Sequence, residues 1–187
     1  MVLPRLLLHL TPFSPTGTMK VVLHLGSAIR DILNSMKREK KVKLCIGEKE
    51  LSFNVDGFIF HSNRVETSSD DVDEIIERLR ELKRYVTKDA MFTSNLEGEI
   101  MGLRREDLEM LSGYLFMVCD LKDFYDKKVM FEKTVYDKEK VREKYNVTLV
   151  IDDIPKVGVK IYAYSENVNK VEKLIDFMTE LLQVLKF

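Results

Sequence analysis

The sequence is poor in the residues that most often carry catalysis or cofactor binding. It has three histidines, two cysteines, eight glycines and no tryptophan among 187 residues. The histidines lack a metal-ligand spacing, and the glycines form neither a phosphate loop ending in Gly-Lys-Ser/Thr nor a Gly-x-Gly-x-x-Gly dinucleotide turn. No Gly-x-Ser-x-Gly nucleophile elbow is present. We therefore predict no cofactor and no metal, and no catalytic residue can be assigned from a motif.

Cysteine usage and the length of the apolar runs bear on location. Cys45 and Cys119 lie far apart in apolar stretches, which is not a disulfide framework. Neither has a basic neighbour or a glycine elbow, so we predict both in the core of a cytoplasmic protein. Neither the run Leu6–Leu10 nor any later apolar run is long enough to span a bilayer, so we predict no membrane span.

The charges are numerous but balanced. Lys and Arg number 30 and Asp and Glu number 31, so the net charge of −1 gives no long-range field that would attract a nucleic acid. The densest basic run, 37–43, is typical of the solvated end of a helix, and RNA binding through it is the alternative. Abundant Lys and Glu with a single glutamine, Gln183, resembles the composition of thermophile proteins.

The first eighteen residues differ from the rest. Three of the four prolines fall in the first fifteen positions, just before Met19 and an apolar run. One interpretation is that residues 1–18 are a Pro-rich extension upstream of a true start at Met19. The other is that Leu6–Leu10, which echoes Val21–Leu25, forms an adjacent strand. In either case we predict a single globular domain over 19–187, long enough to bury its own core.

Hydrophobic periodicity predicts an α+β fold: a mostly antiparallel sheet of short strands, helices packed on one face and a long amphipathic C-terminal helix. The expected helices cover 28–40, 72–86, 104–111 and 168–185, with a short charged helix over 137–145. The expected strands cover 20–25, 42–46, 51–55, 58–60, 114–119, 129–135, 147–151 and 157–164, with a strand or irregular ribbon over 91–102 and a hairpin around 122–128.

The stretch Tyr114–Cys119 is ambiguous. Apolar residues at 108, 111, 115 and 118 would continue the preceding helix, whereas the uninterrupted run Tyr-Leu-Phe-Met-Val-Cys resembles a buried strand. Because Ser112-Gly113 punctuates the chain, we predict a strand. A faint echo between Arg38–Lys40 and Arg142–Lys144 raises an internal duplication, with common helix-end composition as the simpler explanation.

The candidate site residues come from the polar stretch 93–99. In an extended chain Glu97 and Glu99 project from one face, and paired carboxylates can bind a cation or share a proton. The weak ligand-binding candidates are Asn95, Glu97, Glu99 and His61. Charged residues that protect an exposed strand edge are the simpler explanation.

The leading functional hypothesis is a non-catalytic interaction or assembly module, in the form of a homodimer that uses the last helix or an exposed strand edge. Its weak interface candidates are Val171, Leu174, Met178, Leu182 and Leu185. The alternative is an enzyme or small-ligand binder whose site is built from scattered residues. The third hypothesis is RNA binding through the basic run.

Overall fold

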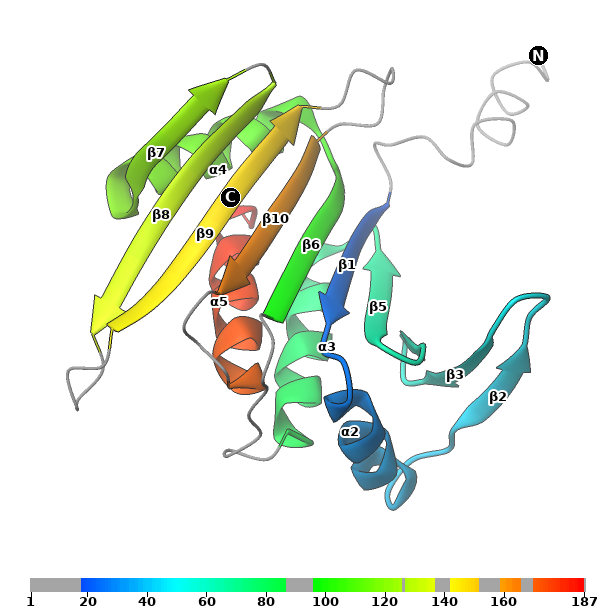
Figure 1. The fold of residues 1–187 in the computed structure, drawn as a ribbon. Helices are drawn as coiled ribbons and strands as arrows, with labels where there is room; N and C mark the ends of the chain where they lie inside the picture. The colour runs from blue at the N-terminus through cyan, green and yellow to red at the C-terminus, as the bar shows by residue number, and fades with distance from the viewer. Residues whose placement is uncertain are drawn as a thin grey trace, which may run out of the picture.

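A computed structural model describes residues 18–86, 96–125, 127–136, 142–151, 159–165 and 170–186. Within these residues the chain forms four helices and one ten-stranded, entirely antiparallel sheet, which confirms the α+β class (Figure 1). The N-terminal half consists of β1 (Met19–His24), α2 (Ala28–Lys37), β2 (Lys43–Ile46), β3 (Leu51–Val55), β4 (Phe58–Phe60), β5 (Arg64–Ser69) and α3 (Val72–Arg84). The C-terminal half consists of β6 (Leu96–Leu103), α4 (Arg105–Val118), β7 (Asp120–Tyr125), β8 (Lys128–Tyr136), β9 (Arg142–Ile151), β10 (Val159–Ser165) and α5 (Val171–Val184).

The two halves have the same topology. Each runs strand, helix, four strands, helix, and the sheet order β2-β3-β4-β5-β1-β6-β10-β9-β8-β7 reads the same from either edge once β1 is matched with β6, β2 with β7 and so on. The centre of this pseudo-twofold arrangement is the antiparallel β1–β6 pair, in register from Lys20 opposite Met101 to His24 opposite Glu97. The Arg-Glu-Lys echo does not mark equivalent positions, because one copy follows α2 and the other begins β9.

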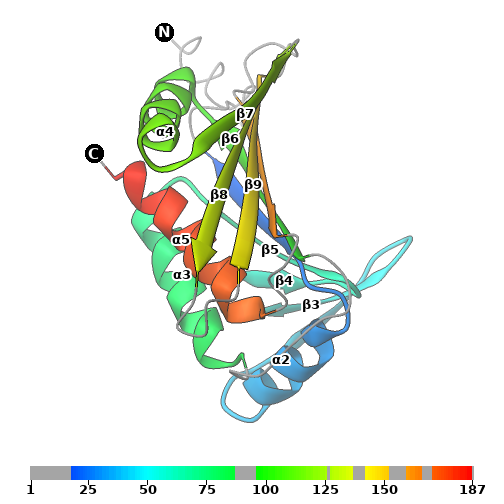
Figure 2. The same cartoon turned by 60° about the vertical axis from the view of Figure 1, so that its left-hand side comes forward.

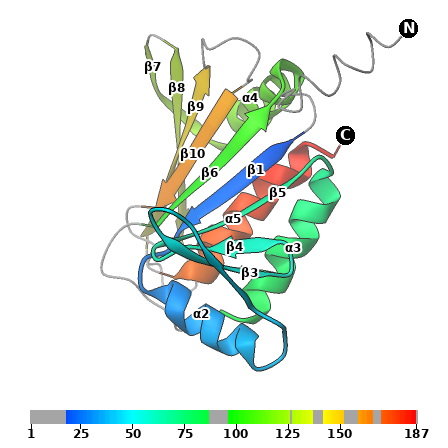
Figure 3. The ribbon, with the colours of Figure 1, turned by 90° about the vertical axis from the view of Figure 1, so that its right-hand side faces the viewer.

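Helices α3 and α5 lie side by side behind the central strands (Figures 1, 2 and 3). Ile75, Ile76 and Leu79 of α3 hold the same relative positions as Leu174, Ile175 and Met178 of α5, and all six side chains are buried. Gly98 of β6 makes room for Met178, since a Cβ at this position would lie 2.7 Å from the Met178 sulfur. The repeated helix pair therefore supplies the centre of the core.

The prediction of a strand over 114–119 is wrong. Helix α4 does not stop at Gly113 but continues to Val118, so Tyr114–Cys119 is not a strand. The helix persists because Leu111 and Leu115 lie on one buried face while Gly113 faces open space. The hairpin expected around 122–128 is present, but its first strand is β7 rather than 114–119, with Tyr125 opposite Lys128 of β8. The six residues of β7 are all exposed and therefore lack the apolar alternation by which a strand is recognised.

Two further strands, β9 and β5, also differ from the prediction. Strand β9 begins at Arg142, where the charged helix over 137–145 was expected; residues 137–141 lie outside the described residues. Strand β5 was not predicted, because its run Thr67-Ser68-Ser69 resembles a helix cap; the cap is Asp71, whose side chain accepts a hydrogen bond from the Asp73 amide at 3.0 Å. The strands expected at 20–25, 42–46, 51–55 and 58–60 are β1 to β4.

In the part of the chain that the structure describes, no helix is both long enough and apolar enough to cross a membrane. Cys45 and Cys119 are both free thiols. Residues 1–17, including the run Leu6–Leu10, lie outside the described residues.

Candidate functional site

The sheet has one face turned away from α3 and α5, and the central strands place polar side chains on it. Leu23 of β1 stands opposite Gly98, which contacts Met178, so this pair faces the helices. Side chains alternate along a strand, so His24 and Glu99 project from the other face. This face carries the residues of the polar stretch predicted from the sequence.

Ion pairs cross this open face between neighbouring strands. His24 Nε2 lies 3.2 Å from Glu99 Oε2 on β6, and Lys20 Nζ lies 3.3 Å from Glu66 Oε2 on β5. Val22 lies between these two ion pairs on β1, opposite Glu66 of β5 on one side and Glu99 of β6 on the other. Each carboxylate thus has a cationic or titratable partner on β1.

His61, at the end of β4, belongs to the same network. Its side chain is 10% exposed, with Nδ1 2.9 Å from Glu50 Oε1 and Nε2 3.4 Å from Glu66 Oε1. Neither contact has the angle of a hydrogen bond, so both buried ring nitrogens are held by proximity to carboxylates alone. Arg64 donates a hydrogen bond to Glu50 at 3.0 Å, which balances one of these charges.

The structure separates the predicted site residues into different surroundings. Glu97 and Glu99 project from the same face, but Glu99 is paired with His24, while His61 lies on the far side of β1. Asn95 lies outside the described residues. Within the described ranges no group of three or more His, Cys, Asp or Glu side chains is placed to hold a metal ion. The partners Lys20, Glu50 and Glu66 were missed, because they come from strands far apart in sequence.

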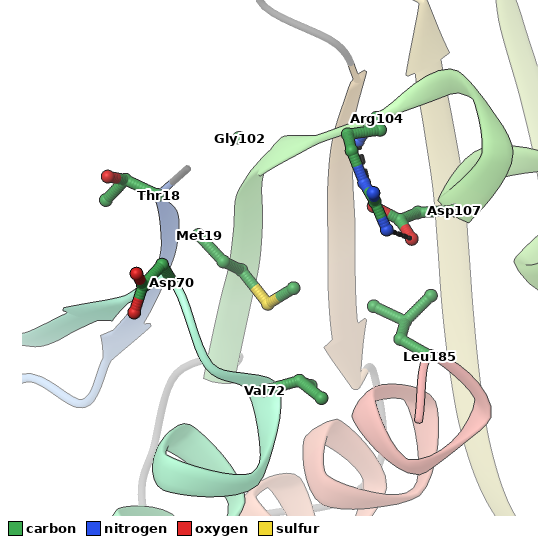
Figure 4. A pocket seen from close by; sticks show the side chains of 8 residues that line it. All are labelled: Thr18, Met19, Asp70, Val72, Gly102, Arg104, Asp107 and Leu185. Carbon is green, nitrogen blue, oxygen red and sulfur yellow. Dashed lines mark hydrogen bonds and ion pairs between the residues drawn. The ribbon is translucent and has the colours of Figure 1, made fainter. Parts of the chain in front are cut away.

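A cavity of about 180 Å³ lies where β1, β6 and α5 meet, and its lining includes Gly102, Arg104 and Asp107 (Figure 4). The Arg104 amide donates to Asp107 Oδ2 at 2.9 Å, and the guanidinium lies against the same carboxylate. This contact raises the pKa of Arg104. Arg104 and Asp107 are therefore occupied in starting α4, which is a structural role.

A second cavity, of about 370 Å³, lies between α2 and strands β3 and β4. Its floor is apolar and includes Phe53 and Phe60, and its wall on α2 includes Leu33, Arg30 and Lys37. Lys37 Nζ stands 5.2 Å from the centroid of the Phe53 ring. This combination of an apolar floor and cationic rim was not predicted from the sequence.

The basic run 37–43 begins with Lys37 at the wall of this cavity, and Lys40, further along the run, is neutralised by acidic partners. Lys40 pairs with Asp56 and with Glu81, the latter at 3.2 Å. Hydrogen bonds to Asp56 and Glu81 raise the pKa of Lys40 to about 12. Lys40, one of the five cations of the basic run, is therefore committed to structural ion pairs that join α3 to the turn after β3.

The interface candidates on α5 are mostly inside the molecule. Val171, Leu174, Met178 and Leu182 are fully buried in the chain's own core, and Leu185 is partly buried. The exposed large apolar side chains gather instead at the two edges of the sheet. Those at the β7 edge are Phe116, Met117, Val118, Leu121, Phe124 and Tyr125, and those at the β2 edge are Leu44, Ile46 and Leu51.

The comparisons with known proteins do not assign a family. No protein family model matches the sequence, and a search of curated proteins finds no match.

Proposed function

We propose that this protein is a non-catalytic assembly module that forms a homodimer through the β7 edge of its sheet. The observation that carries the proposal is the exposure of apolar side chains along an edge strand whose outer side has no neighbour in the sheet. Such an edge offers unpaired backbone groups to another strand, and proteins ordinarily protect it with charge, proline or a covering element.

The apolar side chains of this edge share one face. Leu121 stands opposite Phe131 of β8 and Phe124 opposite Val129, and Phe131 packs edge-to-face against Phe116 of α4 with ring centroids 5.1 Å apart. Leu121 and Phe124 therefore continue the layer beneath the sheet in which α4 lies. They are 50% and 70% exposed, so this layer ends at the edge without a cover.

The charged residues of β7 share the opposite face. A bulge between Leu121 and Asp123 leaves Asp123 opposite Met130, while Lys122 Nζ reaches Glu132 at 3.1 Å. Met130 and Glu132 both alternate with inward-facing Phe131, so Lys122 and Asp123 lie on the open face of the sheet.

This arrangement is self-complementary about a twofold axis that passes between Lys122 and Asp123. In an antiparallel pair of two β7 strands, Leu121 stands opposite Phe124 of the second copy, and Lys122 stands opposite Asp123 of the second copy. The bulge permits this register, because it gives the two opposed residues of each pair the same face. Apolar residues then meet apolar residues and opposite charges meet, each pair worth roughly 0.2–1 kcal/mol.

The dimer expected from these contacts is of moderate affinity. Two paired β7 strands cover only a few half-exposed side chains, which corresponds to a small interface, so we expect a dissociation constant on the order of micromolar.

Sedimentation velocity over a wide concentration range tests the proposal. The wild-type protein should pass from monomer to dimer across the micromolar range, and Phe124→Lys should remain monomeric. The matched control is Ile46→Lys, which places the same charge on the opposite edge at a residue that is 79% exposed and should leave the dimer intact. A wild-type protein that stays monomeric at all concentrations contradicts the proposal.

A charge exchange tests the register. Lys122→Asp alone and Asp123→Lys alone each place like charges opposite one another and should weaken the dimer, whereas the double variant restores opposite charges and should recover it. Failure of the double variant to recover the dimer contradicts the antiparallel register.

A further inference from the structure

The repeated topology allows the cavity beside α2 to be compared with its counterpart beside α4. Buried Ile32 and Met36 of α2 correspond to buried Leu111 and Leu115 of α4. Met36 is followed by Lys37 in α2, and Leu115 is followed by Phe116 in α4, so Lys37 and Phe116 hold equivalent positions. Strand β3, beneath α2, corresponds to β8, beneath α4, so Phe53 corresponds to Phe131.

The two halves fill this position differently. Beside α4 the ring of Phe116 stands edge-on to Phe131 at 5.1 Å, with planes at 87°, and Phe131 is fully buried. Beside α2 the same place holds the ammonium of Lys37, and Phe53 remains partly exposed at the floor of a cavity of about 370 Å³. The N-terminal half thus has an aromatic floor and lacks the ring that covers it in the C-terminal half.

Cations without acidic partners stand at the rim. Arg30 and Lys37 line the cavity from α2, two helical turns apart, and neither makes an ion pair with the residues that the structure describes. His61 lines the cavity, and its Nδ1 lies 2.9 Å from Glu50 Oε1. The charge of Glu50 is balanced by Arg64. The rim of the cavity is therefore positive, because the nearby carboxylate of Glu50 is already paired with Arg64.

We propose that this cavity binds a small amphiphilic organic anion, with its apolar ring over Phe53 and its acidic group between Arg30 and Lys37. The volume lies within the range of about 300–1,000 Å³ typical of small-molecule sites, which combine an apolar lining with a few polar groups that orient the ligand. The Lys37 ammonium moves from above Phe53 to the acidic group of the ligand, so that the ring of the ligand covers Phe53 as Phe116 covers Phe131 in the other half. Arg30 and Lys37 then supply charge complementarity. This site is independent of the proposed dimer, because it lies at the other end of the sheet.

Two dyes with related ring systems test the site. The anionic probe is 8-anilinonaphthalene-1-sulfonate and the neutral probe is N-phenyl-1-naphthylamine, with binding followed by fluorescence. Arg30→Gln and Lys37→Gln should each weaken binding of the anionic dye about tenfold, the loss of about 1.4 kcal/mol expected for a charged contact, and change binding of the neutral dye less than twofold. Arg105→Gln, which removes an exposed charge from α4, is the matched control and should change neither.

Lys37→Phe distinguishes loss of the site from loss of the fold. This variant copies the sequence of the C-terminal half and should cover Phe53 with a ring, so both dyes should lose the site while the melting temperature rises. Anionic dye binding that stays within twofold of wild type in Arg30→Gln, Lys37→Gln and Lys37→Phe overturns the proposal. Binding lost in Phe124→Lys but retained in these three also overturns it, because the dye would then occupy the β7 edge.

Discussion

The same substitution at two glycines should change stability in opposite directions. Gly102, at the end of β6, has φ +79°, and a Cβ there would overlap the carbonyl oxygen of Thr18. Gly113 lies in the middle of α4, is exposed, and would have no heavy atom within 4 Å of an added Cβ. Alanine at the first position is strained and crowded, whereas alanine at the second only improves helix propensity.

The magnitudes follow from these two environments. At Gly102, the left-handed backbone costs about 1–2 kcal/mol for a residue with a Cβ and displacement of a backbone oxygen costs about 1–3 kcal/mol. The reduced entropy of the unfolded chain offsets about 0.4–1 kcal/mol, so Gly102→Ala should destabilise by about 1–4.5 kcal/mol. Gly113→Ala should stabilise by about 0.5–1 kcal/mol.

Urea unfolding followed by far-ultraviolet circular dichroism measures both changes under the same conditions. The two variants have the same composition, so any effect of composition alone cancels between them. A Gly102→Ala variant within 0.5 kcal/mol of wild type would refute the close approach of β6 to the start of β1. A destabilised Gly113→Ala variant would refute the continuation of α4 through residue 113.

Two further predictions concern titration. Burial raises the pKa of the Cys119 thiol to about 11, so alkylation of this site by iodoacetamide, followed by mass spectrometry, should be slow at pH 8 and should accelerate about tenfold per pH unit toward pH 11; fast alkylation at pH 8 would contradict its burial. The ion pairs of Lys40 with Asp56 and Glu81 raise its pKa from 10.5 to about 12, so their contribution to stability is complete below pH 10.5 and is lost as the pH rises through 12. The difference in unfolding free energy between wild type and Lys40→Met should therefore be constant from pH 7 to about pH 10 and shrink above it; a difference that grows with pH would contradict this assignment.

Sequence reasoning succeeded where a segment has one buried face. The apolar stripes of α2 and α3 were visible, because the buried residues of each helix recur at helical spacing on one face. The prediction failed at α4 and β7 for the opposite reason. Phe116 and Met117 are exposed in the last part of α4, where residues 114–118 are all apolar, and β7 is exposed on both faces, so neither segment has the periodicity that identifies its structure.

The polar site could be predicted only in part, for reasons of distance along the chain. That Glu97 and Glu99 share a face follows from the geometry of a single strand. Their partners do not follow, because His24 is 75 residues from Glu99 and is brought to it by the pairing of β1 with β6. The cavity beside α2 could not be predicted from the sequence either, since it is recognised as a candidate site only when Lys37 is compared with Phe116 in the repeated fold.

The two edges of the sheet hold equivalent places in a repeated fold, yet their chemistry differs, and this difference decides how copies can associate. Contact between β2 of one copy and β7 of the next would be head-to-tail and would extend without limit. In the proposed dimer, pairing of β7 with itself would close after two copies, with Leu121 opposite Phe124 and Lys122 opposite Asp123 of the second copy. Lys43 and the short length of β2 disfavour strand addition at the other edge. A closed dimer would thus leave the α2 cavity of each copy facing solvent at the two far ends of a twenty-stranded sheet.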